Sequence, residues 1–186
     1  LRIMKSRILL LFAVVALLAS CGKEESFSPI PEIKFDRYEY YIGTTGKDTA
    51  VDFIFTIKDG DGDIGLADNE FDNSCGADNA NLYLAYEVKD GANFRKKNLW
   101  LQVVEVTPAC DTLIYFDSVQ VKFNQRMQYI EPAGNSKSIE ATVTYRMDYT
   151  SALILLDNIG RFEFYIRDRA NNKSNVVLSN ELILNK

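Results

Sequence analysis

Apolar and polar residues alternate along most of the chain beyond residue 32. Between Val51 and Lys58 every second side chain is apolar, and the side chains between them are mostly polar. A period of two is typical of a β-strand that buries one face. The same pattern, rich in β-branched and aromatic residues, recurs at 82–88, 99–103, 119–123, 139–146, 162–167 and 177–184. The pattern therefore predicts seven or eight strands.

Turn residues, not helices, separate these strands. Clusters of Gly, Asn and Asp interrupt the alternation, and the best helical candidate, Tyr149–Asn158, is long enough only for one or two turns or a loop. Strands that follow one another without helices between them favour an antiparallel sandwich over a βαβ fold. We predict a single all-β domain over 32–186, which is long enough to bury a core.

The last third of the chain carries a family resemblance. Arg161–Asn175 combines an alternating strand with a turn of the Asp-x-Ala-x-Asn type. Asn and Asp suit such a turn because they tolerate left-handed backbone and bond their own main chain. The segment resembles the closing strands of bacterial immunoglobulin-like domains, which implies an immunoglobulin-like β-sandwich. It implies no activity, since such sandwiches serve many functions.

The beginning of the chain is organised as a secretion signal. Three basic residues precede an uncharged run, Ile8–Leu18, that is too short to span a bilayer comfortably. The following Leu18-Ala19-Ser20-Cys21 resembles the lipobox of bacterial lipoproteins. The resemblance implies that 1–20 is a signal peptide with its true start at Met4, and that Cys21 is lipidated and anchors the protein to a membrane. An ordinary signal peptide with an incidental cysteine is the alternative.

A polar, proline-bearing segment, 21–31, follows and is expected to be a flexible linker. Its Lys23-Glu24-Glu25 resembles the acidic export signal of surface lipoproteins in Bacteroidetes-type bacteria. That resemblance implies a lipid anchor in the outer membrane, with the cell surface favoured over the periplasmic face.

The charge balance limits the partners. The chain has 26 acidic and 21 basic residues, a formal charge of −5. Removal of the leader leaves 18 basic residues against the 26 acidic ones, a formal charge of −8. An acidic body argues against nucleic acid as a partner, because phosphates reward Lys and Arg patches. It suits bound cations.

Two cysteines remain after Cys21. Cys75 and Cys110 lie among turn residues in the two long connections, Ala67–Asn81 and Thr107–Thr112. An even pair in an oxidising compartment predicts a disulfide. Neither has the adjacent histidine or basic residue that reactive-thiol chemistry would need.

An acidic, glycine-rich segment follows directly on the 51–57 strand. Asp59-Gly60-Asp61-Gly62-Asp63 places three carboxylates at alternate positions, which suits the oxygen shell of Ca²⁺. Without a cation these like charges would repel one another. Zinc and copper are disfavoured because the chain has no histidine. We therefore predict a structural calcium site with Asp59, Asp61 and Asp63 at its centre.

Other acidic residues are candidates to complete this site. Asp68 and Glu70 follow closely in sequence, and Asp168 joins them if its turn lies at the same end of the domain. The segment partly resembles an EF-hand loop, but Ile64 replaces the turn glycine in one register and no helices flank it. It also resembles a segment that recurs in Bacteroidetes-type lipoproteins. The alternative is an ordinary solvated turn, because turns use Asp and Gly.

No catalytic residue set is evident. The absence of histidine excludes Ser-His-Asp and Cys-His hydrolysis, and no Gly-rich phosphate-binding motif occurs. A carboxylate-based hydrolase remains the lesser alternative. Trp100, between two leucines, is predicted to be in the core, and most of the tyrosines are predicted to line the sandwich core or its rim.

The sequence thus favours a non-enzymatic binding protein or an accessory of an outer-membrane protein complex. A glycan-binding module of a polysaccharide-uptake system is the alternative, and an exposed aromatic row would support it. A flat exposed apolar patch would instead indicate a protein partner.

Overall fold

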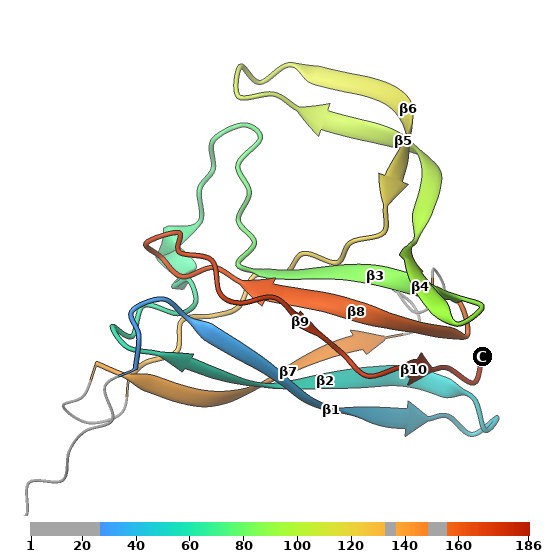
Figure 1. Cartoon of the computed structure of the whole chain (residues 1–186). Coiled ribbons are helices and arrows are strands. Elements are labelled where there is room, and N and C mark those ends of the chain that lie inside the picture. Colours follow the sequence, from blue (N-terminus) through green and yellow to red (C-terminus); the bar gives the residue numbers. More distant parts are fainter. Residues whose placement is uncertain (1–26, 133–136, 149–155) are drawn as a thin grey trace, which may run out of the picture.

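The computed structural model describes residues 27–132, 137–148 and 156–186. Those residues form ten β-strands and one short 3₁₀ turn, and antiparallel sheets pack against each other (Figure 1). The predicted all-β sandwich is confirmed, and its immunoglobulin-like character stays a prediction. No helix in these ranges is long and apolar enough to cross a membrane. The leader, Cys21 and most of the helical candidate 149–158 lie outside the described residues.

Two sheets form the body of the molecule. The first has the order β1-β2-β7 and consists of β1 (Glu32–Ile42), β2 (Asp48–Asp59) and β7 (Ile139–Asp148). The second has the order β10-β8-β3-β4, with β9 also paired to β8. It consists of β3 (Leu82–Asp90), β4 (Asn93–Lys96), β8 (Ile159–Ile166), β9 (Val177–Leu178) and β10 (Leu182–Ile183). The expected last strand, 177–184, is thus split into two short ones.

Aromatic side chains fill the space between the two sheets. Phe53 and Phe55 of β2 meet Phe162 and Phe164 of β8, and all four are fully buried. The ring centroids of Phe53 and Phe162 are 5.0 Å apart, and those of Phe55 and Phe164 are 4.6 Å apart, in edge-to-face arrangements. The apolar residues of the alternating pattern therefore form the core, as predicted.

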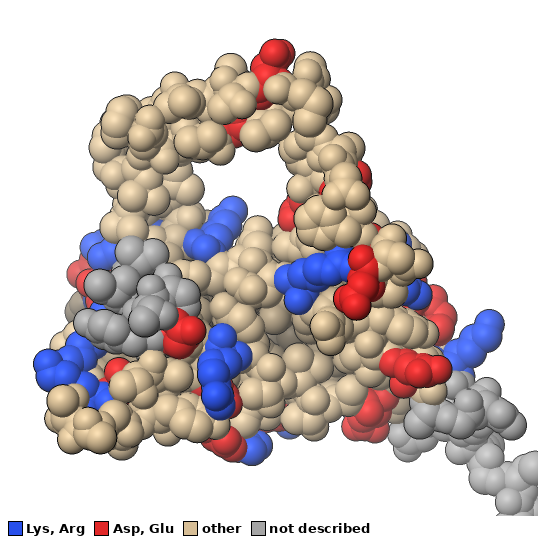
Figure 2. Space-filling view, turned by 180° about the vertical axis from the view of Figure 1, so that it is seen from behind, with Lys and Arg blue, Asp and Glu red and all other residues tan. Residues whose placement is uncertain are grey.

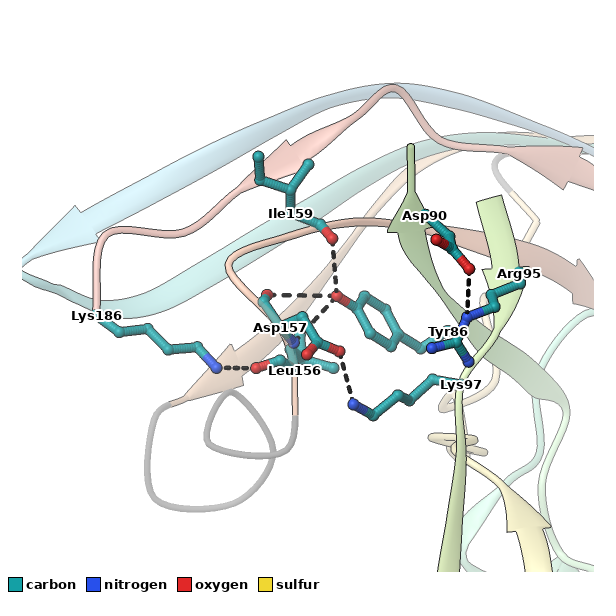
Figure 3. A network of polar contacts seen from close by, with 8 residues as sticks. All are labelled: Tyr86, Asp90, Arg95, Lys97, Leu156, Asp157, Ile159 and Lys186. Atoms are coloured by element: carbon teal, nitrogen blue, oxygen red, sulfur yellow. Dashed lines mark hydrogen bonds and ion pairs between the residues drawn. The ribbon is translucent and has the colours of Figure 1, made fainter. Parts of the chain in front are cut away.

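A buried tyrosine fixes the start of β8 (Figure 3). The Asp157 amide donates a hydrogen bond of 3.2 Å to the Tyr86 hydroxyl, which lies 3.3 Å from the Asp157 carbonyl oxygen. Burial raises the pKa of Tyr86 to about 12. A Cβ atom at Gly160 would lie 2.2 Å from this hydroxyl, so only glycine fits there. The other contacts drawn are those of Tyr86 with Ile159, Lys97 with Asp157, Lys186 with Leu156, and Arg95 with Asp90.

The remaining strands form a separate ribbon. β5 (Asn98–Val106) and β6 (Thr112–Gln120) pair only with each other and stand clear of the two packed sheets (Figure 1). Figure 2 shows an open space between this ribbon and the body. The predicted Cys75–Cys110 disulfide is confirmed, and it links the end of the ribbon to the β2–β3 connection.

The ribbon overturns one sequence prediction. Trp100 was expected in the core, but 71% of its surface is exposed. The segment around it alternates like the body strands, yet no second sheet within the described residues covers either face. Its apolar residues therefore remain at the surface.

Candidate metal centre

The centre begins at the end of β2, with the fully buried side chain of Asp59. Its Oδ2 accepts hydrogen bonds from the backbone N–H groups of Gly62, at 2.8 Å, and Asp63, at 3.1 Å. These bonds fold the loop back over the carboxylate. Its Oδ1 is also buried but has no hydrogen-bond partner. A buried carboxylate oxygen without a partner is costly, and a cation bound beside it would offset that cost.

Glycine allows the loop to close this tightly. Gly62 has a φ of +74°, in the left-handed region that favours glycine. A Cβ atom at this position would lie 2.1 Å from the carbonyl oxygen of Lys137. The loop is also held at Gly60, whose N–H donates to the Ser28 carbonyl at 2.8 Å. The glycines that separate the aspartates are thus required by close backbone packing as well as by the turn.

The loop brings three carboxylates together. One oxygen from each of Asp59, Asp61 and Asp63 lies within 4.8 Å of the others. Asp63 is half-buried and, like Asp59, has a buried Oδ1 without a hydrogen-bond partner. Asp61 is exposed, so water can reach that side of the group. This donor set suits Ca²⁺, which binds six to eight oxygens and accepts water among them.

Burial and like charges raise the pKa values of two of these carboxyl groups, although the charge of Arg169 opposes the rise at Asp63. Burial, with the charge of Asp61 adding to it, raises the pKa of Asp59 to about 6, although the two backbone N–H groups act against this. Burial also raises the pKa of Asp63, and the neighbouring charges of Asp168 and Asp61 raise it further. A divalent cation among these oxygens would favour their charged forms.

The turn after β8 lies at the same end of the domain. The Ala170 N–H donates to Asp63 Oδ2 at 3.1 Å, and the Arg169 N–H donates to the Asp63 carbonyl at 3.2 Å. Asp168 is buried, and its two carboxylate oxygens accept bonds from the backbone and side chain of Asn172, at 2.7 and 2.8 Å. Asp168 therefore contributes a neighbouring charge to the centre while its own oxygens are already hydrogen-bonded.

The other two predicted ligands lie outside the three-carboxylate group. Asp68 and Glu70 are exposed in the 3₁₀ turn η1 (Asp68–Glu70). The Glu70 carboxylate accepts a 2.6 Å bond from the Ala67 N–H and forms an ion pair with Arg169. These contacts, the Ala67 bond first, lower the pKa of Glu70. Nothing in the sequence pairs Glu70 with Arg169, which is distant along the chain.

The geometry suits a structural ion better than catalysis. Asp59 is covered by its own loop, and a glycosidase needs its two carboxylates on either side of a sugar-sized cleft. Two cavities, of about 350 and 270 Å³, are lined by other residues. In the larger one, Tyr83 and Tyr165 stack at 4.6 Å, and the Lys173 ammonium lies 4.0 Å from the Tyr165 ring centre. That contact occupies ring surface on which a sugar would stack.

No protein-family model, curated protein or solved structure matches this chain. The residues of the chain itself are therefore the support for a function. They provide a carboxylate cluster with buried unpaired oxygens at one end of the body, and an exposed apolar ribbon that projects from it.

Proposed function

We propose that the chain is a non-enzymatic, lipid-anchored protein of the bacterial outer membrane, whose β-sandwich is stabilised by Ca²⁺ and binds a partner at the cell surface. The observation that carries this proposal is the buried, unpaired Oδ1 of Asp59 beside Asp61 and Asp63. A group of acidic residues that needs a cation suits an extracellular site, where millimolar calcium fills even weak sites.

The calcium has a structural role in this proposal. The loop that would hold it contacts three separate parts of the chain, at Ser28, Lys137 and Ala170. An ion bound to Asp59 and Asp63 would fix the end of β2 against these parts. It would thereby stabilise the folded chain, since a ligand that binds only the native state must do so.

Thermal unfolding with calcium and with a chelator tests this role. We expect millimolar Ca²⁺ to raise the Tm, with about 2.7 kcal/mol of stabilisation when calcium is at 100 times its Kd. Asp61→Asn should abolish the shift, and the exposed position of Asp61 keeps the fold intact. Asp117→Asn, on the distant ribbon, is the matched control. An unchanged Tm in calcium would overturn the metal site.

The lipid anchor needs a separate test, because Cys21 lies outside the described residues. We expect mass spectrometry of the protein purified from membranes to show acyl chains on an N-terminal Cys21. Cys21→Ala should release the protein from the detergent phase in a partition assay. Protease added to intact cells should cleave the protein if it faces outward. An unmodified Cys21 would overturn the anchor.

The ribbon supports a protein partner over a glycan. Its exposed apolar residues include aliphatic as well as aromatic side chains, namely Trp100, Leu101, Val104, Val106, Leu113, Ile114, Tyr115, Phe116 and Val119. Exposed apolar residues of this kind are typical of protein–protein contacts. A sugar site would need aromatic rings set among polar groups.

A further inference from the structure

The two faces of the β5–β6 ribbon differ in charge. Residues paired across the ribbon share a face, so the register assigns each side chain. We call one side the uncharged face, and it consists of Asn98, Trp100, Gln102, Val104, Val106, Thr112, Ile114, Phe116, Ser118 and Gln120. The opposite face carries two acids, Glu105 and Asp117. The uncharged face has no ionisable side chain at all.

The uncharged face is also the more exposed of the two. Trp100 is 71% exposed, Phe116 64%, Ile114 62% and Val104 61%. On the opposite face, Leu113 is the most exposed of the apolar side chains, at 48%. Figure 2 shows no Lys or Arg on the projecting ribbon, and the sequence has neither between 98 and 120. Proteins commonly use such charges to keep strand edges and faces from associating.

A ribbon of two strands gains little stability from itself. Isolated hairpins are marginally stable in water, and three strands or a covered face are normally required. Here both strands pair only with each other, and the described chain covers neither face beyond the base. The structure therefore leaves an uncharged and largely apolar face open to a partner.

We propose that this partner is a second copy of the same chain, and that two ribbons pack through their uncharged faces in a twofold-symmetric dimer. In such a dimer the same surface patch of each copy forms the interface, so the patch must be complementary to itself. Contact through the opposite face would bring Glu105 and Asp117 of both copies together, and like charges in a contact cost several kcal/mol. Only the uncharged face is compatible with itself.

The register defines how the two faces meet. The Gln102–Phe116 pair lies midway along the uncharged face, with Trp100 towards the base and the Val104–Ile114 pair towards the tip. We place the twofold axis through this middle pair, across the strands and in the plane of contact. Each Trp100 then lies on Val104 and Ile114 of the second copy. Aromatic side chains bury roughly 150–250 Å² each, so two such faces supply on the order of 1,000 Å², the lower bound for a specific interface.

This inference rests on the proposed binding role but not on the calcium site or the anchor. The disulfide ties down the ribbon end, so little freedom is lost when a second copy binds. The core residues of the described chain all lie between Ile33 and Leu184, so we expect residues 21–186 with Cys21→Ser to fold without the leader or acyl chains. That protein isolates the effect of the ribbon.

Analytical ultracentrifugation of this protein tests the dimer. We expect a monomer–dimer equilibrium with a Kd on the order of 1–100 µM, as a small interface allows. Phe116→Ser should raise the Kd at least tenfold. Tyr115→Ser, the adjacent position on the opposite face, is the matched control and should leave it within twofold. Trp100 is the only tryptophan, so its fluorescence should shift to longer wavelength on dilution.

Three results would overturn the proposal. The first is a protein that remains monomeric at 500 µM and does not bind vesicles. The second is a dimer that Tyr115→Ser weakens as much as Phe116→Ser does. The third is a monomer that sediments with neutral phosphatidylcholine vesicles through Trp100 and Phe116, which would assign the face to a membrane. In each case the calcium-dependent Tm and the acylation of Cys21 would be unaffected, so the two proposals fail separately.

Discussion

β3 and β5 are both nine-residue strands with alternating apolar residues, yet they end in opposite environments. β3 pairs with β8 on one side and β4 on the other, and every second side chain from Leu82 to Val88 is buried. β5 pairs only with β6, and none of its side chains is fully buried. Period-two alternation therefore specifies a strand, but the neighbouring elements decide whether its apolar face is buried.

The difference in environment predicts a difference in energy. Phe164→Ala in the body should reduce the free energy of unfolding by about 3–5 kcal/mol, because it removes a fully buried ring and leaves a cavity. Phe116→Ala in the ribbon should change it by less than about 0.5 kcal/mol. Urea denaturation of both variants at low protein concentration measures the contrast. Equal losses would mean that the ribbon packs against the body in solution.

The disulfide is the covalent link between the two regions. Replacement of Cys75 and Cys110 by alanine should cost about 2–4 kcal/mol, since the bridge closes a loop between residues 35 positions apart. Hydrogen exchange should then speed up first in β5 and β6, while β2 and β8 stay protected. Ribbon amides that exchange at the same rate with and without the bridge would contradict this prediction.

The carboxylate cluster makes part of the body sensitive to pH. The pKa of Asp59 is about 6 in the folded chain and near 4 in an unfolded one, so between these values the folded state holds more protons. Without metal, the stability that this group contributes is complete below about pH 4. It is lost as the pH rises through 6, by about 3 kcal/mol at most.

The measurement is the difference in stability between wild type and Asp59→Asn, recorded with chelator from pH 4 to pH 8. This subtraction removes the contributions of groups with the opposite pH trend. Asp52 is one of them, because the hydrogen bond from Arg146 lowers its pKa. The difference should fall as the pH rises, and calcium should restore it at neutral pH. A flat difference would show that Asp59 has an ordinary pKa.

The smallest effect locates the boundary between the regions. Leu99 and Trp100 are neighbours at the base of the ribbon, but Leu99 packs against the core and Trp100 is exposed. Leu99→Ser should cost about 1–2 kcal/mol, and Trp100→Ser less than about 0.5 kcal/mol in the monomer. Differential unfolding of the two variants decides this. A larger loss at Trp100 would place the boundary further along β5.

The sequence predicts local features of this molecule well and distant ones poorly. The strands and the clustering of Asp59, Asp61 and Asp63 follow from short-range spacing, the disulfide follows from an even pair of cysteines, and the structure contains all of them. The exposure of Trp100 does not follow, because Leu99–Val103 has apolar residues on both faces and alternation cannot tell which neighbours exist.

The candidate site shows the same limit. That the turn at Asp168 lies beside Asp63 was a conditional expectation, and the hydrogen bond from Ala170 now meets that condition. The ion pair of Glu70 with Arg169, which takes Glu70 away from the metal centre, could not be predicted from the sequence. It depends on how residues 99 positions apart meet in the folded chain. The unpaired oxygens of Asp59 and Asp63 likewise emerge only from the packing around them.

The Cys75–Cys110 bond also has a topological consequence. Together with the chain from Cys75 through β3, β4 and β5 to Cys110, it makes a closed covalent ring, and the open space in Figure 2 lies between the ribbon and the body within that ring. While the bond is intact, a chain that threads this ring can leave it only by one of its ends. Reduction of this single bond would open the ring and free the end of the ribbon from the β2–β3 connection.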